Sequence, residues 1–204
     1  MDARVSNWSF LVPSADRFLL LPIRDEDPSG AVVPSERSAR GLADALVAAP
    51  FPLVGVPALA AWRSVADGDG ARLLERLAGA VAPGGWLYVG FPNAWYPGYA
   101  GRAGSLTEDR VRAVLSAAGL QPVATYLAFP HERTPAYLIE RDDPAALRYF
   151  LERLSFPYVE GPDRWKSRGK QLALAAARRG ALVAPSGLRA RFAPGLAVTA
   201  RRVP

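Results

Sequence analysis

Residues Phe51–Asn93 read FPLVGVPALAAWRSVADGDGARLLERLAGAVAPGGWLYVGFPN, and this stretch decides the fold class. Apolar runs at its two ends, 51–56 and 86–91, predict two buried strands. Between them, residues 71–81 place apolar side chains on one helical face and charged side chains on the other, which predicts an amphipathic helix. Pro83-Gly84-Gly85 is expected to end that helix. Because a strand, a helix and a strand form the crossover that parallel sheets require, we predict an α/β fold.

The same patterns predict the elements on either side of this unit. Strands are expected at 18–23, 31–33, 123–129, 136–139 and 195–202, and helices at 37–49, 58–65, 107–118, 144–154 and 164–179. The six residues between the strands at 123–129 and 136–139 favour an antiparallel pair, whereas 195–202 is expected to be a final edge strand. We therefore predict a Rossmann-like, mostly parallel sheet with a C-terminal antiparallel strand pair. Residues 1–160 would form this domain, and 161–204 a basic helical extension packed on it.

Composition excludes several classes of protein. The chain has 204 residues, half of them hydrophobic, which suits one domain with one sizeable core and excludes a mainly disordered protein. No apolar run reaches the roughly 18 residues that would span a bilayer, and the N-terminus lacks the pattern of a signal peptide. The absence of cysteine excludes disulfides, thiolate metal sites and a cysteine nucleophile. We expect a cytoplasmic protein without a membrane segment.

Positive charge is concentrated near the C-terminus. The formal net charge is +6, yet residues 161–204 alone contain ten Lys/Arg and one acid. This asymmetry indicates an acidic partner, although a solvated basic surface would give the same pattern. The partner-binding candidates are Arg164, Trp165, Lys166, Arg168 and Lys170. Aromatic and basic residues together can suit nucleic acid, but no nucleic-acid module surrounds them, so a protein or peptide with an acidic surface is favoured.

Candidate ligand-binding residues follow the predicted strands. Four pocket-lining candidates lie just beyond the carboxyl end of a central strand, where open α/β sheets bind ligands: Asn93, Trp95, Tyr96 and Tyr99. Such a loop can also merely cover the sheet end. His131 is the only histidine and could act as a general base, or lie in a surface loop. The acidic run 25–27 lacks the spacing of a known metal-binding loop, so no metal site is predicted.

Residues Ala82–Val89, APGGWLYV, together with Pro92-Asn93, carry a family resemblance. A helix that leads through Pro-Gly-Gly into an apolar strand resembles the penultimate crossover of class I S-adenosylmethionine-dependent methyltransferases. Residues 106–129 look like the next helix and strand of that family. The resemblance implies a trimmed methyltransferase-like architecture, and it implies S-adenosylmethionine as the cofactor of an active member.

The sequence departs from this family where the cofactor would bind. A glycine-rich loop is expected after the first strand, but Ile23 is followed by Arg24-Asp25-Glu26-Asp27. Glu36 is the candidate for the acidic residue that holds the ribose. Only 27 residues separate Ile23 from Phe51, too few for the usual helix, strand, helix and strand.

Two hypotheses about function follow. The first is a non-catalytic pseudoenzyme without cofactor, an accessory or scaffold subunit that binds a partner enzyme or peptide in a bacterial biosynthetic pathway. The second is a divergent S-adenosylmethionine-dependent methyltransferase acting on a small molecule or peptide. In that case Tyr96 and His131 would be catalytic, and Glu36 and Asn93 would bind the cofactor.

Overall fold

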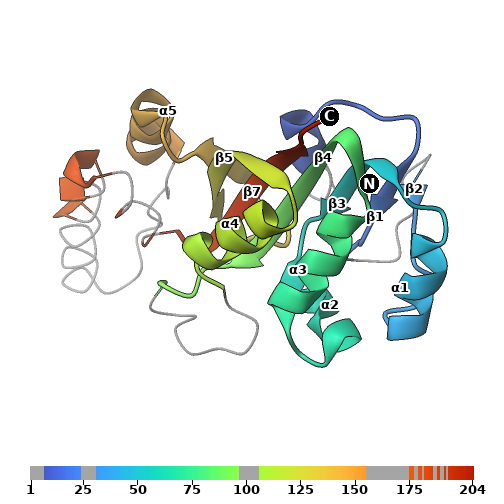
Figure 1. Cartoon of the computed structure of the whole chain (residues 1–204). Helices are drawn as coiled ribbons and strands as arrows, with labels where there is room; N and C mark the ends of the chain where they lie inside the picture. The colour runs from blue at the N-terminus through green and yellow to red at the C-terminus, as the bar shows by residue number, and fades with distance from the viewer. Residues whose placement is uncertain are drawn as a thin grey trace.

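The computed structural model describes residues 7–23, 31–96, 106–154, 175–176, 179–180, 182–185, 188, 191 and 193–204. Its centre is a seven-stranded sheet with the order β2-β1-β3-β4-β7-β5-β6 (Figure 1). The strands are β1 (Phe18–Leu20), β2 (Ala31–Val32), β3 (Phe51–Val56), β4 (Val81–Pro92), β5 (Leu120–Phe129), β6 (Tyr137–Glu140) and β7 (Gly195–Arg202). The first four strands are mutually parallel, and β7 runs antiparallel to both β4 and β5. The predicted α/β fold with a mostly parallel sheet is confirmed.

Four of the helices begin after a capping side chain. The helices are η2 (Asn7–Leu11), α1 (Ala39–Leu46), α2 (Leu59–Trp62), η3 (Arg63–Ala66), α3 (Gly70–Gly79), α4 (Glu108–Ala117), α5 (Pro144–Tyr149) and η4 (Phe150–Leu154). Ser38, Asp69, Thr107 and Asp143 precede α1, α3, α4 and α5, and each side-chain oxygen accepts hydrogen bonds from the first turn. These caps fix the helix starts close to their predicted positions.

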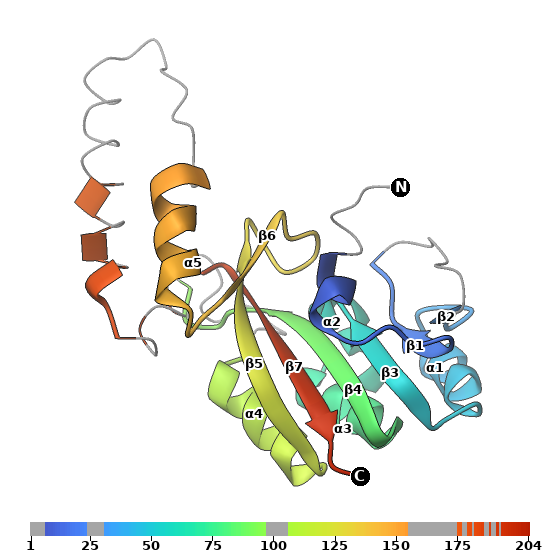
Figure 2. The same ribbon diagram turned by 90° about the horizontal axis from the view of Figure 1, so that it is seen from above.

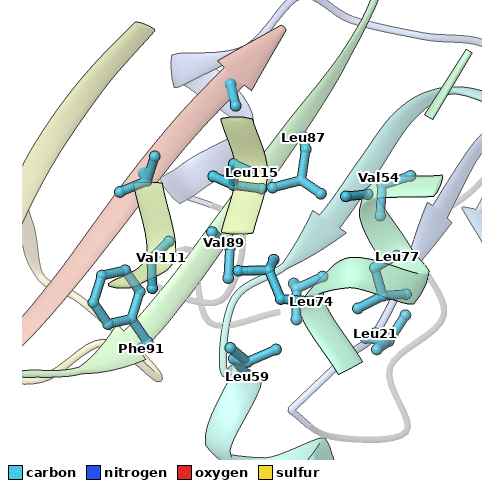
Figure 3. Close-up of a cluster of buried hydrophobic side chains, with 14 of the residues drawn as sticks. Leu21, Val54, Leu59, Leu74, Leu77, Leu87, Val89, Phe91, Val111 and Leu115 are labelled. Atoms are coloured by element: carbon cyan, nitrogen blue, oxygen red, sulfur yellow. The ribbon is translucent and has the colours of Figure 1, made fainter. Parts of the chain in front are cut away.

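Three crossovers lie on one face of the sheet. The connections from β2 to β3 through α1, from β3 to β4 through α3, and from β4 to β5 through α4 all move in the same direction across the sheet. Right-handed crossovers in one direction place their helices on the same side. Accordingly, residues of α1, α2, α3 and α4 join one buried cluster with the sheet, part of which Figure 3 shows around Leu74, Leu77, Val89 and Val111.

The opposite face is covered by η2 and its surroundings, which Figure 2 shows on the other side of the sheet from α3 and α4. Trp8 of η2 stacks on Tyr88 of β4, with ring centroids 5.3 Å apart. It also lies directly on Gly55 of β3, where an added Cβ would come within 2.5 Å of the indole. A glycine at position 55 is therefore required for this close approach.

The Pro-Gly-Gly turn does not separate helix from strand, which corrects the predicted end of the helix. Helix α3 ends at Gly79, and β4 is already paired at Val81, where the carbonyl of Ala80 accepts a hydrogen bond from Phe51 N at 2.8 Å. Phe51 pairs with Val81 and Leu53 with Trp86, so β4 bulges between these pairs. Gly84, at φ 73°, lies in this bulge and takes a conformation that other residues rarely adopt.

Strand β7 is central, so the predicted edge position of residues 195–202 is wrong. It lies between β4 and β5 and pairs with both over most of its length. All residues from Gly195 to Ala200 are buried. The predicted antiparallel pair of β5 and β6 is confirmed, with β6 as the outermost strand.

We expect Trp8→Ala to lower the free energy of unfolding by about 3 kcal/mol, because it removes a buried indole from between Gly55 and Tyr88. Urea unfolding followed by circular dichroism measures the loss. Phe10→Ala, in the same short helix but 85% exposed, is the matched control and should change stability by less than about 0.5 kcal/mol. Equal losses in the two variants would contradict the role assigned to Trp8.

Candidate functional site

The carboxyl ends of the parallel strands gather all four of the predicted catalytic and cofactor-binding residues at one edge of the sheet. Glu36 follows β2, Asn93 and Tyr96 follow β4, and His131 follows β5, which is parallel to β4. They are spread along this edge, since three strand spacings, about 14 Å, separate β2 from β4. The order of strands reverses between β1 and β3, so the crevice beyond these two strands is where an open α/β sheet binds its ligand.

Trp62 lies in this crevice. It ends α2, the helix that follows β3, and only 1% of its surface is exposed. Its indole Nε1 donates a hydrogen bond of 2.9 Å to the carbonyl oxygen of Pro22, two residues past the end of β1. The contact links the chain segments that leave β1 and β3, so the indole occupies the space between them.

Arg37 contacts the same backbone segment and the Trp62 ring. Its guanidinium donates hydrogen bonds to the carbonyl oxygens of Pro22 and Ile23, and its Cζ lies 5.5 Å from the centre of the Trp62 ring. Glu36 is exposed, and its Oε1 accepts a hydrogen bond of 2.6 Å from the hydroxyl of Ser38, the cap of α1. Arg37 is exposed and lies over the buried Trp62 ring, so both side chains engage the backbone that follows β1.

The described residues therefore do not fit S-adenosylmethionine in this conformation. A nucleoside needs a slot between the two strand ends and acceptors or donors along its walls. In this chain the carbonyls of Pro22 and Ile23 already accept hydrogen bonds from its own side chains. Residues 24–30, which follow β1, lie outside the described residues.

Asn93 is buried at the end of β4, where it holds two parts of the backbone together. Its Nδ2 donates to the carbonyl of Ala193 at 2.8 Å, and its Oδ1 accepts from the backbone N of Trp95 at 3.1 Å. Its own backbone N donates to Pro194 at 3.1 Å. Asn93 thus joins β4 to the entry of β7. Its predicted role in cofactor binding is not tested by these contacts and stays a prediction.

Tyr96 and His131 are both half-buried, in separate loops. The backbone N of Tyr96 closes a turn on Asn93, and the neighbouring Trp95 is 51% exposed with the Arg191 guanidinium 4.7 Å from its ring centre. His131 accepts a hydrogen bond of 3.3 Å from Thr134 N through Nδ1. This hydrogen bond holds the imidazole of His131 in place but does not identify a substrate. The catalytic roles of Tyr96 and His131 therefore stay predictions.

The remaining predictions from the sequence are not tested. Half of the predicted extension from residue 161 lies outside the described residues, and so do Tyr99 and the partner-binding candidates Arg164, Trp165, Lys166, Arg168 and Lys170. The partner site and the domain division therefore stay predictions. Within the described ranges, no three His, Asp or Glu side chains gather as a metal site would require. No helix in the described part of the chain is long and apolar enough to cross a bilayer.

An ionic network beside α4 has a structural explanation. Glu108 is buried at the first turn of α4, forms ion pairs with Arg141 and, at 3.7 Å, with Arg112, and accepts a hydrogen bond of 2.8 Å from Thr125 Oγ1. Hydrogen bonding to Asp142, followed by the charge of Glu108, raises the pKa of Arg141 and keeps it charged despite partial burial. The Glu108 charge is compensated, so this network ties α4 to β5 and to the end of β6.

Sequence reasoning missed Trp62 and Arg37, the two residues that engage the backbone after β1. The available signal was a tryptophan at the end of the first helical turn after a buried strand, close to the expected ligand edge. Its contact with Pro22 depends on the pairing of β1 with β3, which local patterns do not reveal.

Two solved structures show a low similarity to this chain. No protein-family model and no curated protein matches the chain. A SAM dependent methyltransferase from Archaeoglobus fulgidus is 12% identical with a TM-score of 0.48, over 98% of this chain and 92% of that chain. The [4+2]-cyclase SpnF is 17% identical with a TM-score of 0.33, over 75% of this chain and 51% of that chain, so the match spans about half of the cyclase. Both TM-scores are below 0.5, so the α/β assignment rests on the strand order and pairing of this chain.

We expect Asn93→Ala to lower the free energy of unfolding by about 2 kcal/mol, because it leaves the buried carbonyl of Ala193 and the Trp95 N–H without the amide. Thermal and urea unfolding measure this loss. Trp95→Ala, in the same loop but half exposed, is the control and should cost less than about 1 kcal/mol. A stable Asn93→Ala variant would show that the amide is not a structural link.

Proposed function

We propose that this chain is a methyltransferase-like protein without a working cofactor site, and that it acts as a non-catalytic accessory or scaffold subunit. The observation that carries the proposal is the contact that the chain makes with itself at the reversal of strand order. The buried Trp62 side chain and the Arg37 guanidinium engage the backbone carbonyls after β1, where a cofactor would have to bind.

The partner is proposed to be an enzyme or peptide of a bacterial biosynthetic pathway, with an acidic contact surface. Support comes from charge: residues 161–204 contain ten Lys/Arg and one acid. Charge of this density attracts an oppositely charged surface and speeds association at low ionic strength. The proposed contacts are Arg164, Trp165, Lys166, Arg168 and Lys170.

A divergent methyltransferase is the second candidate. It is favoured by the collection of Asn93, Tyr96 and His131 at the carboxyl edge of the sheet, where α/β enzymes hold their substrates. It requires Trp62 and Arg37 to move apart from Pro22, because the cofactor cannot share that space with them.

Titration calorimetry with S-adenosylmethionine and S-adenosylhomocysteine separates the two candidates. We expect no binding of either compound up to about 1 mM. A dissociation constant of about 10 μM would instead stabilise the fold by about 2.7 kcal/mol at that concentration, which thermal unfolding would detect independently. Such binding would overturn the non-catalytic proposal and favour the methyltransferase.

The partner proposal needs a charge-matched comparison. A partner that co-purifies with the full chain is identified and titrated against the wild type and against a variant with Arg164, Lys166, Arg168 and Lys170 changed to Glu. We expect at least a tenfold loss of affinity in this variant. The control changes four exposed arginines on the described helices, Arg40, Arg72, Arg110 and Arg148, to Glu. Equal losses in both variants would mean that only net charge matters, and would contradict a site at residues 164–170.

A further inference from the structure

The loop between β5 and β6, Pro130–Ala136, folds back onto the sheet. Ala136 N donates to the carbonyl of Phe129 at 2.8 Å, which closes the loop at its base. Asn7 of η2 donates through Nδ2 to the carbonyl of Pro135 at 2.9 Å, which ties the returning end of the loop to η2. Glu132 and Pro135 are buried. We refer to residues 130–136 as the lid.

A glycine allows the lid to lie against the strands: an added Cβ at Gly195 of β7 would come within 2.4 Å of the backbone N of Glu132. Gly90 of β4 lies nearby, where an added Cβ would be in ordinary contact, 3.5 Å, with the carbonyl oxygen of Glu132 and would clash with the carbonyl of Pro57. Residues alternate between the two faces of a strand, so Gly90 shares a face with Tyr88, the residue that stacks on Trp8. The lid therefore covers the end of the face that η2 covers elsewhere.

Glu132 carries a carboxyl group into this contact, with little to compensate a charge. Its side chain is 4% exposed, and Oε1 lies 3.8 Å from the mostly exposed Arg133 Nε, too far for a close ion pair. Its Oε2 is buried without a hydrogen-bond partner among the described residues. Burial raises the pKa of Glu132, and this effect is reduced by the backbone N–H of Glu132 itself, by Arg133 and by His131.

Among the residues that the structure describes, the elements packed against the lid add no cation near this carboxyl group. From β4, the buried Tyr88 hydroxyl has its pKa raised by burial, then by Tyr126 and Glu132. From β5, the pKa of Tyr126 is raised by burial and by Glu140 of β6 and lowered by a hydrogen bond with Thr199 of β7. The described helix η2, NWSFL, and the buried part of β7, Gly195–Ala200, contain no titratable side chain. The groups that favour the ionised form of Glu132 are its own backbone N–H, then Arg133 and His131, all of them on the lid.

We propose that the lid is a pH-sensitive latch: it is held on the sheet by the uncharged carboxyl group of Glu132 and opens when that group ionises. Ionisation places a charge where Oε2 has no partner, and the carboxylate gains water only if the lid leaves the sheet. Opening uncovers Gly195, and so gives access to the end of the face opposite the helices. This latch is independent of the proposed function.

The direction of the pH effect follows from the raised pKa in the closed form. The closed form binds a proton more tightly than the open form, in which the carboxyl group has a pKa of about 4.3. The latch is therefore fully effective below about pH 4 and weakens as the pH rises through the interval between this value and the raised pKa. Within that interval the opening equilibrium shifts toward the open form by up to about tenfold per pH unit.

Hydrogen–deuterium exchange of the lid tests the proposal. Protection of peptides that cover residues 129–137 is measured from pH 4 to pH 8 and corrected for the intrinsic pH dependence of exchange, with β4 as the internal reference. We expect the wild type to lose protection in the lid as the pH rises, while β4 keeps its protection. Glu132→Gln, uncharged and of the same shape, should remain protected at every pH.

Glu140→Gln is the matched control, because Glu140 is an exposed carboxylate on β6 that also influences Tyr126. It should lose lid protection with pH as the wild type does. A wild-type lid whose protection does not change with pH would overturn the proposal. So would a Glu132→Gln variant that follows the wild-type pH dependence, since the loss would then come from another group.

Discussion

The handedness of the crossovers determines most of this structure. The chain passes from β2 to β3, from β3 to β4 and from β4 to β5 in one direction across the sheet. A right-handed connection fixes the side on which its helix packs, so three connections in one direction bring α1, α3 and α4 to the same face. The main hydrophobic cluster forms there. The opposite face receives no helix from these crossovers and has to be covered by other parts of the chain.

The segments that cover the opposite face lie unusually close to the backbone of the strands. Trp8 lies on Gly55, and the backbone of Glu132 lies over Gly195, contacts that a side chain on either glycine would prevent. A hydrogen bond from Asn7 to Pro135 joins the two covering segments although they are 128 residues apart. Small residues on the strands thus allow irregular segments to take the place that helices take on the first face.

Local elements could be predicted because their signals are local. Capping residues and apolar periodicity indicated the helices, and continuous apolar runs indicated β3 and the middle of β4. The position of β7 could not be predicted in this way: GLAVTARR alternates like an edge strand, and only the two neighbours that it acquires make both of its faces buried. The Pro-Gly-Gly segment was wrongly predicted to separate the helix from the strand for a similar reason. The pairing of Phe51 with Val81 extends β4 through this segment, and local patterns do not reveal that pairing.

The sequence indicated which strands the candidate residues follow, but it did not indicate the contacts that these residues and their neighbours make. Strand ends and topology located Glu36, Asn93, Tyr96 and His131 at one edge, whereas the contact of Trp62 with Pro22 joins residues 40 apart in the chain. A buried carbonyl and a buried indole N–H each need a hydrogen-bond partner. Pro22 and Trp62 satisfy each other, so separating them would cost about 1–3 kcal/mol for each group left unpaired. A ligand could enter this crevice only by offering both an acceptor to the indole and a donor to the carbonyl, and it would also have to displace Arg37 from the same backbone. The contact between Trp62 and Pro22 is thus held by hydrogen bonds of the chain itself, which a ligand at this position would first have to replace.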